Sequence, residues 1–406
     1  MAAPVVCGAN MTRPRTEEVR PEMQLLLCCA RTRLGASHIE RIRVLVRPDL
    51  NWAAFMALAD QHALIPLVHL HLSKLFARVP DLWLERMEKA ARSNAIRSLF
   101  LGNELARILD VFHSRKISAI PYKGPVLAAQ AYLDTALRQF DDLDIIIPQS
   151  DLAAAHEAML ALEYRARFPW KRGAETSTSR IPGEYTYRGP GQSLVELHTE
   201  FTMRHFPVRP DIAHFANRLA QVSVDGRNVA TFRAEDALAV LCVHGAKDFW
   251  ERLSWLVDLA ALLETSVRLD WDAVFETADS LGARRMLLLG LSLAHDLIET
   301  LVPKKATETI EADHAVADLT ALVRRKLTVE KQSWSAPNRL GFRYRLIENR
   351  GDAARYVWRL ATALAEDEWP GEETSGFASR LQALFRPLRL VRKHGATASH
   401  SEQNPF

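Results

Sequence analysis

Apolar side chains recur at three- and four-residue intervals in two long parts of the chain. In the first part, residues 21 to about 115, Leu101, Leu105, Ile108 and Phe112 follow the spacing of one helix face. In the second part, from about residue 233, the stretch RAEDALAVLCVHGAKDFWERLSWLVDLAALLE keeps this spacing for longer than one ordinary globular helix, so we expect two helices there. The pattern therefore predicts helical regions on both sides of a different middle part.

The middle part alternates short apolar runs with turn residues. ISAIPYKG is typical of a strand that enters a glycine, LDIIIP of a strand closed by Pro148, and EYTYRGPGQSLVELHTEF of two strands joined by a Gly-Pro-Gly turn. The intervening stretches PVLAAQAYL and SDLAAAHEAMLALEY favour helices, the second with Ser150 as its expected N-cap. We therefore expect a small mixed-sheet unit of roughly a hundred residues, a common domain size.

The predicted fold class is α+β, because the strands are confined to one unit flanked by helices. A chain of 406 residues exceeds what one hydrophobic core usually spans. We divide it into a disordered tail, an N-terminal helical region, a mixed α/β core, a C-terminal helical region and a second disordered tail: 1–20, 21–115, 116–232, 233–393 and 394–406.

Composition and charge narrow the class of protein. The apolar share of 48% and charged share of 25% are ordinary for a soluble globular protein, and a formal charge of +3 argues against a general nucleic-acid binder. A basic, aromatic segment, RRKLTVEKQSWSAPNRLGFRYR, is interpreted as a solvated surface, with a local nucleic-acid groove as the alternative.

Location is an expectation from what the sequence shows. The first residues contain no apolar stretch of signal-peptide length, and MLLLGLSLAHDLI, from Met286, is too short to span a bilayer. The four cysteines have no metal-ligand spacing, which favours a reducing compartment. We expect a cytoplasmic protein that does not bind membranes.

Three aspartates crowd the start of a predicted buried strand, FDDLDIII. Side chains alternate faces along a strand, so Asp142 and Asp144 share one face, about 7 Å apart, while Asp141 lies on the other. Two carboxylates on one face repel each other unless a cation lies between them, and Mg²⁺ prefers such oxygen ligands. We predict a metal-binding pair at Asp142 and Asp144 and interpret Asp141 as a solvated residue.

A third carboxylate lies in SLVELHTEF, where Glu196 and His198 face the same way between apolar residues. If this strand lies beside LDIII, Glu196 completes a cluster of three carboxylates. The alternative is an exposed strand face on which Glu196 forms a salt bridge. His198 either orients Glu196, contacts a substrate, or is a core histidine.

The stretch PYKGP has the features of a phosphate-binding turn. A strand that ends in Gly124 and is followed at once by a helix places free backbone N–H groups and a positive helix end together. Gly124 permits close approach of a phosphate, and Lys123 adds a positive charge.

Together these stretches resemble the nucleotidyltransferase superfamily related to DNA polymerase beta, and more closely a family of uncharacterised bacterial nucleotidyltransferases. The resemblance rests on NWAAFMALADQHALIPL, ISAIPYKGPVLA, LRQFDDLDIIIP, SLVELHTEF, HGAKDFWERLSWLVDLAALL and a closing FRPLRL near residue 385. It covers most of residues 50–390. The chain departs from the superfamily in having Pro125 where serine or glycine usually follows the turn glycine, and Glu196 where aspartate is common.

The resemblance implies an activity and its ligands. A nucleoside monophosphate would pass from a nucleoside triphosphate (NTP), such as ATP, to an acceptor hydroxyl, and pyrophosphate would leave. Two Mg²⁺ ions would be held by Asp142, Asp144 and Glu196, with Glu196 or His198 activating the acceptor. Lys123, Gly124 and Arg138 would contact the nucleotide.

The helical stretch after the core supplies one more candidate. His244, Lys247 and Glu251 fall at three- and four-residue spacing, and Trp255 and Asp258 continue the same pattern. We predict that Lys247 contacts phosphate; the alternative is an exposed helix face with an intrahelical Lys247–Glu251 pair.

Two functions therefore stay open. The first is catalysis with a small molecule or a protein as the acceptor, nucleic acid being the least expected. The second is a non-catalytic module that binds nucleotide or a protein partner on the same fold.

Overall fold

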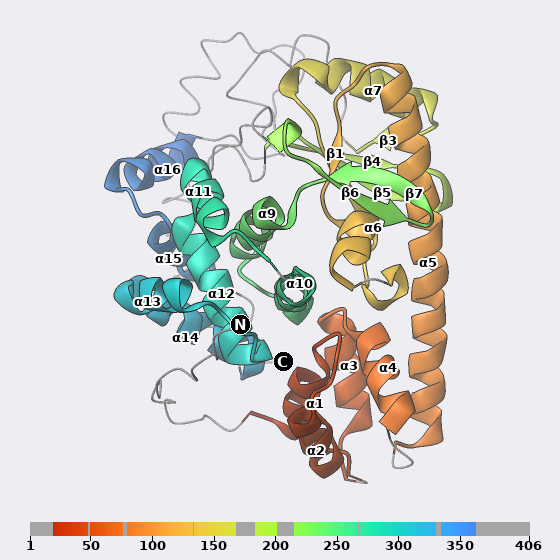
Figure 1. Ribbon diagram of the computed structural model, residues 1–406, viewed down its shortest axis with the longest axis vertical. Helices are drawn as coiled ribbons and strands as arrows, with labels where there is room; N and C mark the ends of the chain where they lie inside the picture. Colours follow the sequence, from red (N-terminus) through yellow and green to blue (C-terminus); the bar gives the residue numbers. More distant parts are fainter. Residues whose placement is uncertain are drawn as a thin grey trace, which may run out of the picture.

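The computed structural model describes residues 19–47, 49–75, 79–132, 134–167, 183–200, 215–266, 268–329 and 334–362. The expected tails, apart from residues 19 and 20, and the FRPLRL segment lie outside the described residues. The described part of the chain is an α+β protein in which a mixed five-stranded sheet and a two-stranded sheet are flanked by helices (Figure 1).

In the described part of the chain, five helices precede the sheet, as the apolar spacing predicts: α1 (Pro21–Cys29), α2 (Ala36–Leu45), α3 (Trp52–Gln61), α4 (Ile65–Leu75) and α5 (Asp81–Ser114). The first turn of α3 is closed by Asn51, whose side-chain oxygen accepts from the Ala54 N–H at 3.0 Å. Helix α5 runs along one side of the molecule, from the first four helices to the sheet (Figure 1).

The sheet has the strand order β1-β2-β5-β4-β3. Its strands are β1 (Ile120–Pro121), β2 (Asp142–Ile146), β3 (Arg165–Ala166), β4 (Glu184–Arg188) and β5 (Leu194–His198). Strands β2 and β5 are parallel, and every other neighbouring pair in this sheet is antiparallel. The Gly-Pro-Gly turn is confirmed: β4 and β5 are joined through a 3₁₀ turn, Pro190–Gln192.

Short helical elements connect these strands. Strand β1 leads into α6 (Gly124–Leu127), a π-helical turn (Ala128–Tyr132) and a 3₁₀ turn (Thr135–Leu137), and β2 leads into a 3₁₀ turn (Gln149–Asp151) and α7 (Leu152–Ala161). Ser150 does not cap the latter helix as expected, because the 3₁₀ turn delays its start and places Asp151 at the N-cap position. The Asp151 carboxylate instead accepts from the Ser118 N–H at 2.9 Å.

The two faces of the sheet have different surroundings. Leu143, Ile145, Val195 and Leu197 are buried in a core shared with α5 and α7. Alternation places Asp144, Glu196 and His198 on the opposite face, where Ile146 joins the larger core formed with the helices that follow the sheet. The polar residues therefore lie between the sheet and these helices.

A two-stranded sheet, β6 (Ala220–Val224) and β7 (Arg227–Thr231), precedes the C-terminal helices. These are α9 (Ala234–Lys247), α10 (Leu253–Thr265), α11 (Trp271–Leu281), α12 (Arg284–Ile298), α13 (Lys304–Ala312), α14 (His314–Thr328), α15 (Ala336–Leu346) and α16 (Arg350–Thr362). The expectation of two helices after residue 233 is confirmed by α9 and α10. Among the described residues, none of the helices combines the length and apolar character that a bilayer span requires.

Candidate active site

The turn after β1 brings the backbone close to β2. The Tyr122 N–H donates to the Asp144 carbonyl at 3.2 Å, and Gly124 then adopts a left-handed backbone with φ +55°. A Cβ atom on Gly124 would lie 3.1 Å from the Asp142 carbonyl oxygen, so a side chain there is both strained and crowded. Glycine is therefore required by the geometry of the turn, whatever the turn binds.

Asp144 is the most enclosed of the three aspartates. Its side chain is 1% exposed, and its Oδ1 atom lies 2.7 Å from Lys123 Nζ and 3.0 Å from His198 Nε2. Asp142 is half-buried on the same strand face, whereas Asp141 is exposed. The shared face of Asp142 and Asp144 therefore agrees with the structure, while Asp141 precedes the strand and is solvated as expected.

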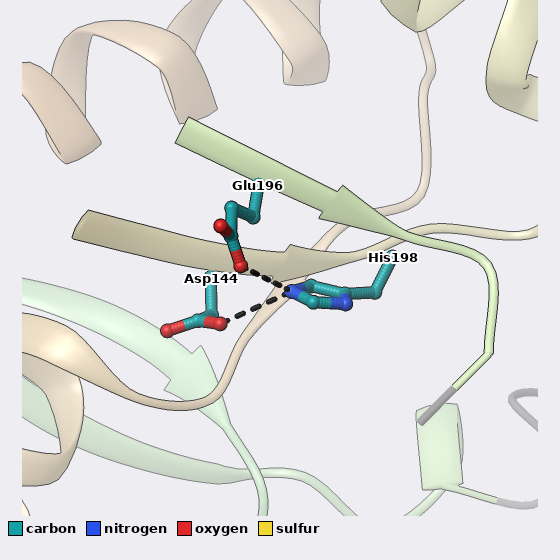
Figure 2. Close-up of side chains that lie close together, drawn as sticks. All are labelled: Asp144, Glu196 and His198. Atoms are coloured by element: carbon teal, nitrogen blue, oxygen red, sulfur yellow. Dashed lines mark hydrogen bonds and ion pairs between the residues drawn. The ribbon is translucent and has the colours of Figure 1, made fainter. Parts of the chain in front are cut away.

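Parallel pairing of β2 and β5 assembles the acidic cluster. Asp144 is opposite Glu196, and Ile146 is opposite His198. Figure 2 shows the three side chains converging, with His198 Nε2 3.7 Å from Glu196 Oε2. One ligand atom from each of Asp144, Glu196 and His198 lies within 4.8 Å of the other two, close enough for all three to bind one cation.

This set differs in part from the predicted one. Asp144 and Glu196 come together as expected, and His198 takes the third position in the group. Asp142 lies on the same face two residues before Asp144, beside the group rather than within it. The two carboxylates are ligands that suit Mg²⁺ or Mn²⁺, with phosphate oxygens or water completing the shell, whereas an imidazole is a ligand typical of transition metals. The donor set therefore fits a divalent cation.

Helix α9 closes the site from the opposite side. Lys247 Nζ donates to Glu184 Oε2 at 3.0 Å, and Glu184 is paired with His198 across β4 and β5. His244, one turn earlier on α9, lies 3.5 Å from Lys123 Nζ through its Nδ1 atom. The sequence reasoning missed Glu184, although its alternation with Thr186 along EYTYR is the signal that could have placed it on this face.

The expected single polar face from His244 to Asp258 is wrong. Helix α9 ends at Lys247, because Phe249 and Trp250 adopt left-handed backbone conformations and Trp250 packs against Gly245. Glu251 is exposed between the two helices, so Lys247 does not form the alternative pair with it and instead binds Glu184. Trp255 still reaches His244, with ring centroids 5.1 Å apart.

Arg138 is buried next to the glycine turn rather than open to solvent. Its Nε and Nη2 atoms donate to the two carboxylate oxygens of Asp258 on α10 at 2.8 and 2.9 Å. The Tyr132 hydroxyl donates to the same carboxylate at 2.8 Å, and Arg138 Nη1 lies 3.5 Å from the Gly124 carbonyl oxygen. Arg138 thus links the turn to the C-terminal helices, and contact with a nucleotide would require these bonds to rearrange.

The carboxyl groups of the cluster differ in pKa because their surroundings differ. Burial, helped by the charges of Asp144, Glu184 and Asp142, raises the pKa of Glu196 to about 8. Burial also acts on Asp144, but Lys123 and His198 outweigh it and hold the Asp144 pKa well below its usual range. In the metal-free protein, Asp144 is therefore the ionised member of the pair and Glu196 holds a proton near neutral pH.

Comparison with known proteins identifies the family. The model of the uncharacterised nucleotidyltransferase family matches residues 48–299, more than half of the chain. The chain belongs to the uncharacterised nucleotidyltransferase family. The resemblance seen in the sequence is thereby confirmed, and the match spans every residue of the cluster, the glycine turn and helices α9 and α10. A search of curated proteins found no match.

Family membership gives the general chemistry. The protein is a nucleotidyltransferase, with a nucleotide as substrate, and the cluster of Asp144, Glu196 and His198 is a candidate metal site. Transfer of this kind requires neutralisation of phosphate charge and activation of an acceptor. Lysine ammonium groups and carboxylates that lie close together between the sheet and α9 can perform both tasks.

Proposed function

We propose that the protein is a Mg²⁺-dependent nucleotidyltransferase that moves a nucleoside monophosphate from an NTP to an acceptor hydroxyl and releases pyrophosphate. The observation that carries the proposal is the parallel register of β2 and β5. This register places Glu196 opposite Asp144. Strand β2, which carries Asp144, lies beside β1, which leads into the Lys123–Gly124 turn. Metal ligands and a phosphate-binding turn then lie side by side, as in-line transfer needs.

Asp144 and Glu196 would hold the metal, with His198 orienting these two carboxylates and Asp142 beside them. When bound, Mg²⁺ supplies charge neutralisation for the phosphates and lowers the pKa of the acceptor hydroxyl. We propose two ions, one on the nucleotide side at Asp142 and Asp144 and one shared with Glu196, since three carboxyl groups line this face.

The chain's own groups would bind and orient the triphosphate. Gly124 leaves its backbone accessible to phosphate, and Lys123 directly precedes it. Lys247 would contact phosphate from α9, a role that requires its bond to Glu184 to open. Arg138 would act on the nucleotide through Gly124, whose carbonyl oxygen it approaches.

Glu196 and His198 are both candidates for removing the acceptor proton. A pKa of about 8 on Glu196 supports a group that exchanges protons near neutral pH. His198 is 3% exposed and lies between Asp144 and Glu196, so it can also orient the carboxylate. The acceptor would be a small molecule or a protein hydroxyl in the cytoplasm, and a formal charge of +3 gives no support for nucleic acid.

The test is to follow the α-phosphate. Purified protein is incubated with Mg²⁺ and each of the NTPs labelled at the α position, alone and with a small-molecule extract of cells. The proposal predicts that label moves to protein or to a small molecule while pyrophosphate appears. Tight NTP binding with all label remaining on the triphosphate would favour the non-catalytic nucleotide-binding module instead.

A further inference from the structure

Lys123 occupies a special position in the candidate metal site. Its ammonium lies 2.7 Å from Asp144 Oδ1, the same oxygen that His198 contacts at 3.0 Å. The Lys123 side chain is 9% exposed and that of Asp144 is 1% exposed. A charged lysine is therefore buried against the carboxylate that the proposed metal would need.

Charge balance explains why the two groups pair without a metal. An ionised carboxylate removed from water needs a cation nearby, or it takes up a proton. Lys123 supplies that cation to Asp144. Once a divalent ion binds Asp144, the carboxylate is already balanced, and an ammonium on the same oxygen repels the metal.

The Lys123 ammonium can also reach a second partner, the phosphates of a bound nucleotide. Lysine carries its charge on a flexible four-carbon stem, and the next residue is Gly124, where the triphosphate is proposed to bind. A triphosphate brings several negative charges to this turn, enough to hold both the metal and the ammonium. His244 Nδ1 lies 3.5 Å from Lys123 Nζ, so the ammonium has a polar neighbour besides the cluster.

We infer that Lys123 and the divalent metal are alternative partners of Asp144, and that Lys123 moves to the phosphates when metal and NTP enter together. The inference rests on the proposed function. Its consequence is that metal binds weakly to the free protein and strongly with nucleotide. By linkage, the metal raises nucleotide affinity by the same factor.

The experiment uses Mn²⁺ as the probe, because free Mn²⁺ is counted directly by its paramagnetic resonance signal. Mn²⁺ is titrated into the full chain alone and with a saturating NTP analogue that has a methylene group between the α- and β-phosphates, and the Mn²⁺ that the analogue holds in a protein-free titration is subtracted. The wild-type protein is expected to bind Mn²⁺ at least tenfold more tightly with the analogue. Equal Mn²⁺ affinity with and without the analogue would overturn the inference.

Lys123→Met removes the competing charge and keeps a side chain of similar length. It should raise the affinity for Mn²⁺ alone at least tenfold and reduce the coupling between Mn²⁺ and the analogue. Lys305→Met is the control, because Lys305 also pairs with an aspartate, Asp272, but neither residue belongs to the cluster or the glycine turn, and its affinity for Mn²⁺ alone should change less than threefold. Unchanged or weaker Mn²⁺ binding by Lys123→Met would contradict the exchange.

Further variants at Lys123 and the α-phosphate assay keep the test decisive. Lys123→Arg retains the charge and should keep the weak binding of Mn²⁺ alone. If Lys123→Met does not fold, Lys123→Gln, which is also neutral, takes its place with the same expected result. Failure of the proposed function has a different signature, because no label would then leave the triphosphate in the α-phosphate assay, whatever the Mn²⁺ titrations show. A Mn²⁺ affinity that changes neither with the analogue nor with Lys123→Met would contradict the exchange and would still support the metal site.

Discussion

The catalytic and the purely structural interpretations of the cluster predict different behaviour for the Glu196 side chain. It lies opposite Asp144, within reach of His198, with its pKa raised by burial to about 8. An exposed glutamate in a surface salt bridge, the alternative considered from the sequence, would not have these surroundings.

Glu196→Gln should reduce turnover by about 10² or more, the scale expected on loss of a positioned acid–base group. NTP binding should be retained, because Asp142 and Asp144 can still bind the metal ion on the nucleotide side. The measurement is turnover beside equilibrium binding of the methylene analogue. Near-normal turnover would remove Glu196 from the mechanism and leave His198 as the next candidate for the base.

The same substitution should change how stability depends on pH. The folded, metal-free protein binds the Glu196 proton more tightly than the unfolded chain does, since the pKa is about 8 rather than 4.5. This contribution is present at low pH and is lost as pH rises from the unfolded value through the folded one. Urea unfolding with a chelator should therefore show wild-type losing stability relative to Glu196→Gln between pH 5 and 9. Parallel pH profiles would contradict the raised pKa.

At the scale of elements, Gly124 combines a left-handed backbone with a crowded surrounding. Gly124→Ala should lower nucleotide affinity and also cost about 1–2 kcal/mol of stability through backbone strain. Gly226→Ala is the matched control, because Gly226 has φ +81° but nothing within 4 Å of an added Cβ. It should lose comparable stability and keep nucleotide affinity. Equal affinities for the two variants would make Gly124 an ordinary turn residue.

Strand alternation explains why much of this site could be predicted from the sequence. A period of two places Asp142 with Asp144 and Glu196 with His198, whatever the rest of the fold does. The parallel register between β2 and β5 depends on α7, β3 and β4, which lie between them in the chain, and no local pattern specifies it. Glu184 was missed because alternation with Thr186 gives only its face, and its place beside His198 depends on the register between β4 and β5.

Local backbone exceptions explain why the single polar face from His244 to Asp258 was wrong. The three- and four-residue spacing continues past Lys247 in the sequence, but left-handed Phe249 and Trp250 end α9. Neither is glycine or asparagine, the residues that usually signal such a turn. Packing of Trp250 against Gly245 and Gly290 stabilises this conformation, and Gly290 is distant in sequence.

At the scale of the whole molecule, the site depends on helices from both sides of the sheet. The larger core contains residues of α1 and α4 together with residues of α9, α10 and α12. We propose the divisions near residues 116 and 233 as units of sequence organisation. Their helices share apolar contacts, and Arg138 and Asp258 add a buried ionic link between the glycine turn and α10.

Asp258→Ala should destabilise the fold by about 3–5 kcal/mol, because it leaves the Arg138 charge buried without its partner. The double variant Arg138→Met with Asp258→Leu should lose much less. Glu40→Ala, which breaks the exposed Glu40–Arg43 pair, should cost at most about 1 kcal/mol. The measurement is urea unfolding of all three variants. A loss below about 1 kcal/mol for Asp258→Ala would show that the link does not hold the turn to α10.

The most direct test of the proposed function is to measure transfer of α-labelled nucleoside monophosphate together with pyrophosphate release in wild-type, Asp144→Asn and Asp141→Asn proteins. Asp144 lies close to Glu196 and His198, whereas Asp141 is exposed and precedes the strand. We predict Mg²⁺-dependent transfer with equimolar pyrophosphate in wild-type and Asp141→Asn, and a loss of at least about 10³ in Asp144→Asn, the upper range for removing one electrostatic stabiliser. Equal activity in Asp144→Asn and Asp141→Asn, or transfer without Mg²⁺, would contradict the account.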